Sequence, residues 1–168
     1  MTMRHNTDAT DQAGNGAVGH WLALYERDIT HAANRLIHRV CAPLFFVSLL
    51  GILWCIPVPG TLEAQLAALN WATLFAMATV VYYFVMSITL ALGSLPFIAA
   101  SLGGMAWLEQ TGAPLLTIAS VVFLVASLGQ FIGYRLQSGG SLLHDLLYCV
   151  IGPIWVLAAL YRRLGIPY

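Results

Sequence analysis

Four polar residues that precede the first long apolar segment have the types and the spacing of a chemical site. Asp28, His31, Arg35 and His38 follow one another at intervals of three, four and three residues, so on one continuous helix their side chains form a single stripe. Imidazole and carboxylate groups on such a stripe can hold a metal ion or move protons. His31 and His38 would lie about 10 Å apart along an ideal helix, so a metal site would need further ligands from elsewhere in the chain.

The surrounding segment, residues 17–39, also has a simpler interpretation. It mixes apolar side chains with charged ones, which is typical of an amphipathic helix that lies in the membrane interface. In that case Glu26, Asp28 and the arginines form a solvated face in the headgroup region and screen one another. Taken alone, the segment leaves both interpretations open.

A second polar cluster precedes the last apolar segment. Its members are Tyr134, Arg135, Gln137, His144 and Asp145, and Gln130 lies about one helical turn before them. A neutral amide such as Gln130 is tolerated inside a helix bundle where neighbours hydrogen-bond it. Gly129 and Gly133 form a GxxxG pair, which is typical of close helix packing. His144 and Asp145 also fit a helix start, because an acidic group favours the positive end of the helix dipole.

The composition places the chain among integral membrane proteins. Hydrophobic residues make up 60% of the sequence, charged residues make up 8%, and the mean hydropathy is +0.80, far from the balance of a soluble domain. The formal net charge is zero, so no excess of basic residues is available to displace counterions from a nucleic acid. We therefore expect a membrane as partner and no nucleic acid.

The uncharged runs of the sequence predict the membrane spans. One helical crossing needs about 20 residues, so the run over residues 64–108 should form two crossings, for which Ser87, Gly93, Ser94 and Pro96 offer places to turn. We predict an all-α, multispanning helical bundle that is preceded by the interfacial amphipathic helix. Its five short transmembrane helices are expected at residues 41–58, 70–86, 89–108, 113–135 and 145–161.

Domain organisation and orientation follow from this pattern. Residues 1–16 carry too few apolar side chains to pack and are predicted to form a disordered tail, whereas residues 17–168 form a single membrane-embedded domain. Five crossings place all five histidines and five of the seven arginines on one side, opposite Arg162 and Arg163. The positive-inside rule makes that side cytoplasmic. The N-terminus and both polar clusters of this multi-pass protein are therefore predicted to face the cytoplasm.

Three sequence segments resemble a known family. They are NRLIH at 34–38 with Pro43, GQFIGYRLQ at 129–137, and HDLLYCVIGPIWVLAALYRRLGIPY at 144–168. In their order and spacing they are similar to the family named for the metabolism of phytosphingosine to odd-numbered fatty acids, and the likeness covers most of residues 21–168. The resemblance implies a small multispanning dioxygenase that uses iron(II) (Fe²⁺) to remove one carbon from 2-hydroxy fatty acids. The substrate would lie in the bilayer with its carboxyl end presented to histidine-bound iron.

The chain departs from the family pattern at several polar positions. His38 matches an expected histidine, but Ile29 stands where members usually carry another, with His31 nearby. Tyr134 replaces the histidine that usually follows Gln-Phe-Ile-Gly. Gln137 and Ser141 replace a glutamate and a proline.

Three hypotheses about function remain open. The first is an iron dioxygenase with a rearranged site, in which His31, His38 and His144 bind the metal and Asp28 or Asp145 adds a carboxylate. The second is a metal-free isomerase or cyclase of a lipid or terpenoid, with Asp28, His38, Tyr134 and Asp145 as acid and base groups. The third is a non-catalytic membrane protein that binds a lipid or a partner. The residues expected to bind substrate are Asn34, Arg35, Gln130, Arg135 and Gln137.

Overall fold

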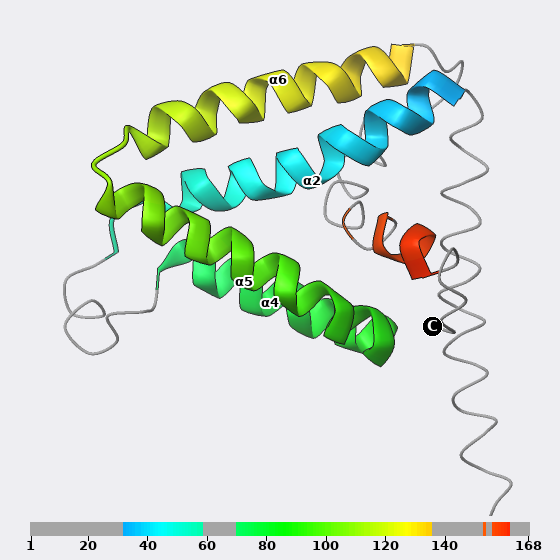
Figure 1. Ribbon diagram of the computed structural model, residues 1–168, viewed down its shortest axis with the longest axis horizontal. Helices are drawn as coiled ribbons and strands as arrows, with labels where there is room; N and C mark the ends of the chain where they lie inside the picture. Colours follow the sequence, from blue (N-terminus) through cyan, green and yellow to red (C-terminus); the bar gives the residue numbers. More distant parts are fainter. Residues whose placement is uncertain (1–31, 59–69, 136–152, 154–155, 162–168) are drawn as a thin grey trace, which may run out of the picture.

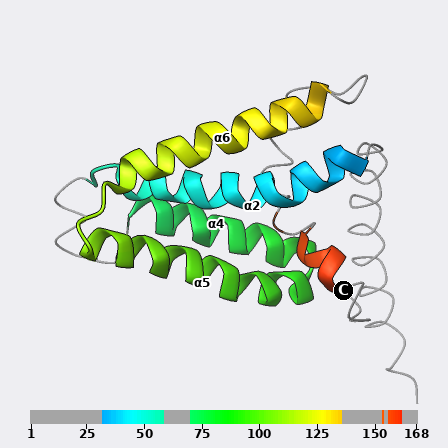
Figure 2. The same ribbon diagram turned by 45° about the horizontal axis from the view of Figure 1, so that its top comes forward.

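The computed structural model of the chain describes residues 32–58, 70–135, 153 and 156–161. Within these ranges the protein is all-helical, as predicted, and four helices form an antiparallel bundle (Figure 1). The helices are α2 (Ala32–Trp54), α4 (Trp71–Met86), α5 (Ile88–Gln110) and α6 (Leu115–Arg135). Helices α2 and α5 run in one direction, and α4 and α6 run back. Figure 2 shows α2 between α6 on one side and the α4–α5 pair on the other.

Three of these helices are long and apolar enough to cross a membrane. The spans are Leu36–Trp54, Ile88–Gln110 and Leu115–Gly133, with 19, 23 and 19 residues. At about 1.5 Å per residue they measure roughly 28–35 Å, close to the hydrocarbon thickness of a bilayer. Large apolar side chains such as Val85, Leu124 and Val125 are largely exposed on α4 and α6, as expected where lipid covers a helix. These three helices agree with the predicted membrane class, but they do not confirm the count of five spans.

The long apolar run folds back on itself at Ser87. This residue has an extended backbone (φ −161°, ψ 126°) between α4 and α5, and its N–H donates to the Tyr83 carbonyl at 2.8 Å. The other turn positions that the sequence offered, including Pro96, lie inside α5. A proline removes one backbone hydrogen bond, and a membrane helix tolerates this loss when its surroundings satisfy the carbonyl.

Local sequence explains where α4 and α6 begin. Asn70 accepts a hydrogen bond from the Thr73 N–H at 2.9 Å, and the Thr73 hydroxyl is within 2.9 Å of the Asn70 N–H, which forms a capping box. Ahead of α6, Gly112 adopts a φ of 71° and its N–H donates to the Glu109 carbonyl. Glycine suits this left-handed conformation because it lacks a Cβ. The helices accordingly start within two residues of the predicted 70 and 113.

Helix α2 differs from the prediction at its N-terminal side. A span was expected to begin at residue 41, after the last charge, but α2 continues unbroken through His38, Arg39 and Cys41. Charged residues are compatible with helical backbone, and no glycine or proline precedes Pro43 in this helix. The rest of the predicted interfacial helix lies outside the described residues. A separate amphipathic helix is not confirmed.

The predicted fifth span, residues 145–161, is also not confirmed. Residues 156–161 are helical, and the phenol oxygen of Tyr161 contacts α5 directly at Gly93. A crossing helix that begins at residue 145 would instead bring Tyr161 to the opposite end of α5, near Gln110. The described part of this segment therefore lies against the N-terminal half of α5.

The most extensive packing joins α2 to α6. A Cβ placed on Gly129 would lie 2.6 Å from Cys41 Sγ, so the α6 backbone approaches α2 closely where the GxxxG pair predicted it. Further along, the Phe45 and Phe123 rings lie 4.6 Å apart between centroids, and a Cβ on Gly51 would lie 2.9 Å from Ala119 Cβ. These contacts set an antiparallel register between the two helices.

Substitution of Gly129 tests this close approach. Gly129→Ala should lower the free energy of unfolding by about 1–3 kcal/mol because the new methyl group meets Cys41 Sγ. The double variant Cys41→Ala/Gly129→Ala should recover most of the loss, since the new methyl group is then 3.8 Å from the Cβ of residue 41. Unfolding titrations in mixed micelles measure both values.

Gly103→Ala is the matched control, because a Cβ at Gly103 meets no atom within 4 Å. It should be neutral or stabilising, since alanine favours helix by about 1 kcal/mol over glycine. Equal destabilisation by Gly129→Ala and Gly103→Ala would contradict the assigned packing.

Candidate functional site

His38 is placed in the interior of the bundle by the face of α2 on which it lies. His38, Ala42, Phe46 and Leu50 follow at intervals of four residues, and each is at most 4% exposed. Residues four apart share one face of a helix, and here that face contains Phe46 and Leu50 of the main hydrophobic core. His38 therefore lies one helical turn before Ala42, at the N-terminal end of a stripe that is otherwise apolar.

Gln130 reaches the same end of the bundle from α6. Its neighbour Gly129 packs against Cys41 and Ile37, so the antiparallel register brings Gln130 level with the N-terminal part of α2. Gln130 is 8% exposed, as expected for an amide that faces a bundle interior. The described members of the two polar clusters therefore lie at one end of the α2–α6 pair, which is the arrangement that a shared site requires.

The two described arginines at this end occupy different surroundings. Arg39 is partly buried, one turn before Pro43 on α2. Arg135 is exposed, and its guanidinium carbon lies 5.2 Å from the centroid of the Phe131 ring. Arg135 is five residues from Gln130, about 140° around an ideal helix. Its side chain is thus directed to the outer surface of α6, away from the face that packs on α2.

The side chains of the remaining candidate residues lie outside the part of the chain that the structure describes. Asn34 and Arg35 belong to α2 and Tyr134 belongs to α6, but only their backbone positions are described. The others, Asp28, His31, Gln137, His144 and Asp145, lie outside the described residues.

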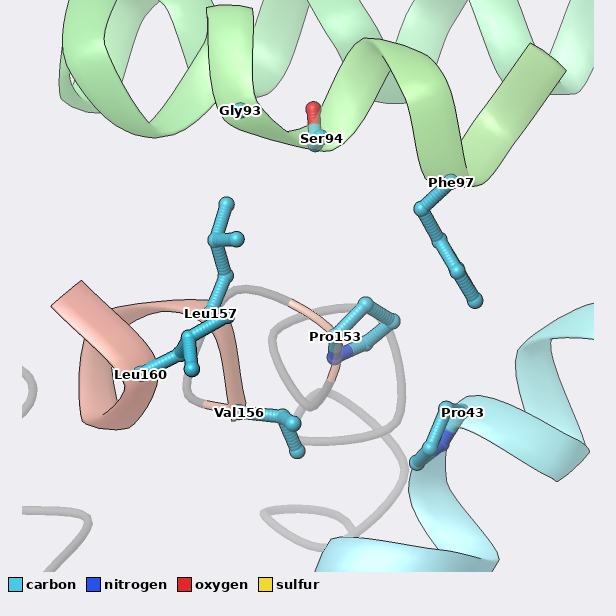
Figure 3. A pocket seen from close by; sticks show the side chains of 8 residues that line it. All are labelled: Pro43, Gly93, Ser94, Phe97, Pro153, Val156, Leu157 and Leu160. Atoms are coloured by element: carbon cyan, nitrogen blue, oxygen red, sulfur yellow. The ribbon is translucent and has the colours of Figure 1, made fainter. Parts of the chain in front are cut away.

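A small apolar cavity lies beside this end of the bundle. Its volume is about 140 Å³, and Figure 3 shows side chains from α2, α5 and the C-terminal segment around it. They are Pro43, Gly93, Ser94, Phe97, Pro153, Val156, Leu157 and Leu160. The Ser94 hydroxyl donates to the Ala91 carbonyl at 2.8 Å, and in Figure 3 its oxygen turns toward α5 and away from Leu157 and Pro153. The cavity walls are consequently almost free of polar groups.

Sequence reasoning missed this cavity because its walls come from three segments distant in the chain. The only signals of this cavity in the sequence are the two prolines at its rim, Pro43 and Pro153. Pro43 cannot donate a helical hydrogen bond to the Arg39 carbonyl, so the α2 backbone carries an acceptor without its usual helical donor one turn from the cavity. The apolar pocket thus touches α2 at Pro43, four residues after Arg39 and five residues after the buried His38.

This combination suits an amphiphile with a polar head and an apolar chain. Pockets for such ligands are mostly apolar, with few polar groups that fix orientation. Arg39 could pair with an anionic head at the end of the bundle, and an apolar cavity of comparable size, about 150 Å³, is known to bind a ring such as benzene. The chain of the ligand would enter between α5 and the segment 156–161.

The described residues contain no group of three metal-binding side chains. Of the expected iron ligands, only His38 lies within the described ranges, and the carboxylate described there, Glu109, is in the last turn of α5 at the far end of the bundle. In comparisons with known proteins, no family model, no curated protein and no solved structure matches the chain.

Filling the cavity tests its role in chain binding. Val156→Phe adds a ring to the cavity wall, so it should exclude an acyl chain. A fatty acid with a terminal photoreactive group should label residues 93–97 and 156–160 of the wild-type protein, and Val156→Phe should reduce this labelling about tenfold.

Val125→Phe is the matched control, because Val125 is exposed on the outer face of α6. It should leave the labelling of residues 93–97 and 156–160 unchanged. Labelling of the cavity residues that persists in Val156→Phe would exclude this cavity as the chain site.

Proposed function

We propose that this chain is a membrane-embedded lipid-modifying enzyme of the type that it resembles, an iron(II)-dependent 2-hydroxy fatty acid dioxygenase that removes one carbon. The observation that carries the proposal is the position of His38. The imidazole is buried at the end of the bundle where Arg39 and an apolar cavity also lie, and it is the histidine that matches the family pattern.

Different residues at this end of the bundle bind the acyl chain and the carboxylate of the substrate. The acyl chain occupies the cavity beside Phe97, Val156 and Leu157, because transfer of CH₂ groups out of water is favourable by about 0.8 kcal/mol each. Arg39 attracts the carboxylate and so keeps the head of the substrate at the end of the bundle. His38 lies one residue from Arg39, at the level to which the carboxyl end is directed.

Iron(II), when bound, would supply the activation of oxygen. Neutral imidazole and carboxylate groups are suitable ligands for this ion, and His38 is the proposed ligand within the described residues. The further proposed ligands are His31, His144 and either Asp28 or Asp145. The buried surroundings of His38 exclude bulk water, which favours reaction of the bound lipid over side reactions.

The proposed orientation places this end in the cytoplasm. Arg35, Arg39 and Arg135 belong to the ends of α2 and α6 that lie here, and an excess of arginine close to helix ends is typical of the cytoplasmic face. The substrate would enter from the bilayer, and its carboxyl end would face the cytoplasmic interface.

Substitution of His38 tests the proposal. Purified wild-type protein should contain about one iron per chain and shorten a 2-hydroxy fatty acid by one carbon in the presence of oxygen. His38→Ala and the bulkier His38→Gln should lose both iron and activity, with activity falling about a hundredfold or more. Elemental analysis and chromatography of the products give the two readouts.

Ser127→Ala is a suitable control, because the Ser127 hydroxyl donates to the Phe123 carbonyl on its own helix. It should retain iron and activity. Activity that survives in chelator and without iron would overturn the dioxygenase proposal in favour of metal-free acid–base chemistry. Activity and iron content that are unchanged in both His38 variants would exclude His38 from the site.

A further inference from the structure

A second hollow lies at the opposite end of the bundle from His38. It has a volume of about 450 Å³ between the end of α2, the start of α4 and the turn from α5 to α6. Its walls combine apolar groups such as Pro57 and Leu115 with the carboxylate of Glu109 and the indole of Trp54. This hollow is too far from the candidate site to belong to it.

Glu109 has an unusual position for a carboxylate. It lies in the last turn of α5, where the helix dipole disfavours negative charge. No other aspartate or glutamate occurs in residues 32–58, 70–135, 153 and 156–161, and in those ranges no arginine forms an ion pair with it. Helix stability therefore does not explain why a charged group occurs here.

Trp54 holds this carboxylate at the wall of the hollow. The indole Nε1–H donates to Glu109 Oε2 at 2.9 Å, which orients one carboxylate oxygen and leaves the other available. Donation to an anion also increases the electron density of the indole ring. Tryptophan is the best aromatic partner for a cation, and quaternary ammonium ions are bound by combinations of aromatic rings and negative charge.

The surroundings place this pair at the level of lipid headgroups. Trp54, Trp71 and Trp107 belong to the ends of α2, α4 and α5 that meet here, and tryptophan is enriched at membrane interfaces. Trp71 is further tied to the end of α2 through a hydrogen bond from its Nε1 to the Pro57 carbonyl at 3.3 Å. The Asn70 side chain is engaged in the α4 capping box, so Glu109 and Trp54 are the groups at this wall that suit a cation.

We infer that Glu109 and Trp54 bind the ammonium group of a zwitterionic phospholipid. The carboxylate supplies charge, the indole ring supplies a cation–π contact, and the hollow accommodates the headgroup at the interface. The acyl chains of the lipid would extend along the exposed apolar side chains of α5 and α6. This site is separate from the proposed catalytic end, so its test is independent of enzyme activity.

Lipid adducts of the intact protein test the inference directly. Purified protein is mixed with equal amounts of phosphatidylcholine and phosphatidylglycerol in dodecyl maltoside, and the retained adducts are counted by native mass spectrometry. The wild-type protein should prefer phosphatidylcholine. Glu109→Gln and Trp54→Leu should each lower this preference about tenfold, whereas Gln110→Ala, the adjacent exposed position, should leave it unchanged.

Competition with soluble tetramethylammonium tests the binding of the ammonium group without the rest of the lipid. It should displace phosphatidylcholine from the wild-type protein at concentrations where sodium does not. Equal retention of both lipids by the wild-type protein, or an unchanged preference in Glu109→Gln, would overturn the inference. Equally tight binding of soluble choline and phosphatidylcholine would overturn its lipid part. Thermal unfolding of each variant confirms that it is folded.

Cys55 provides an internal reporter at the same site. Burial and the nearby Glu109 carboxylate raise the pKa of the Cys55 thiol, so less of it is thiolate near pH 8. In a Cys41→Ala/Cys149→Ala background, phosphatidylcholine should lower this pKa, because its ammonium group offsets the Glu109 charge. Alkylation of Cys55 near pH 8 should therefore accelerate when the lipid is added.

Glu109→Gln removes the charge permanently. Alkylation should be faster than in the parent and insensitive to phosphatidylcholine. The pH profile of alkylation in dodecyl maltoside measures both effects, and an equal response to the lipid in the parent and in Glu109→Gln would contradict ammonium binding at Glu109.

Discussion

The close packing of α6 on α2 is the constraint on which the rest of the structure depends. In a membrane, helices gain little from the hydrophobic effect between them, so association relies on close contact. Gly129 permits that contact at Cys41, and Gly51 permits it at Ala119. The two contacts lie far apart along α2 and set one antiparallel register. That register brings the buried Gln130 to the end of the bundle where α2 carries His38.

The α4–α5 hairpin completes the bundle and gives its two ends different chemistry. Helix α2 starts at the end of the bundle that contains His38. Because the chain turns at Ser87, α5 starts at the same end. Arg39 and the apolar cavity lie at this end, where an acyl chain and an anionic head can be bound together. The opposite end gathers Trp54, Trp71 and Trp107 with Glu109. An anionic lipid suits the first end, and the ammonium group of a zwitterionic headgroup suits the second.

Sequence reasoning predicted the elements with strong local signals. The apolar runs predicted membrane helices by length, and the predicted starts at residues 70 and 113 lie within two residues of the observed starts of α4 and α6. The start of α2 was misplaced because the last charge, Arg39, was taken as a boundary, although a charge does not end a helix. Pro96 was a candidate turn position, but it lies inside α5.

The candidate site was predictable only in part. The sequence predicted a shared polar end from the side-chain types of His38 and Gln130, and it predicted close helix packing from the GxxxG pair. The described structure places His38 and Gln130 at the same end of the α2–α6 pair. The apolar cavity was not predictable, because it depends on how the segment 156–161 lies against Gly93. No local pattern encodes that tertiary contact. The hydrogen bond between Trp54 and Glu109 joins residues 55 positions apart and was likewise invisible in the sequence.

Cross-linking of native Cys41 to an introduced cysteine tests the α2–α6 register most directly. In a Cys55→Ala/Cys149→Ala background, Gly129→Cys should form an intramolecular disulfide with Cys41 under mild oxidation, whereas Ala119→Cys, which lies near Gly51, should not. Mass spectrometry of the digested protein identifies the linked peptides. A disulfide between Cys41 and position 119, with none to position 129, would contradict the antiparallel register and the shared polar end that follows from it.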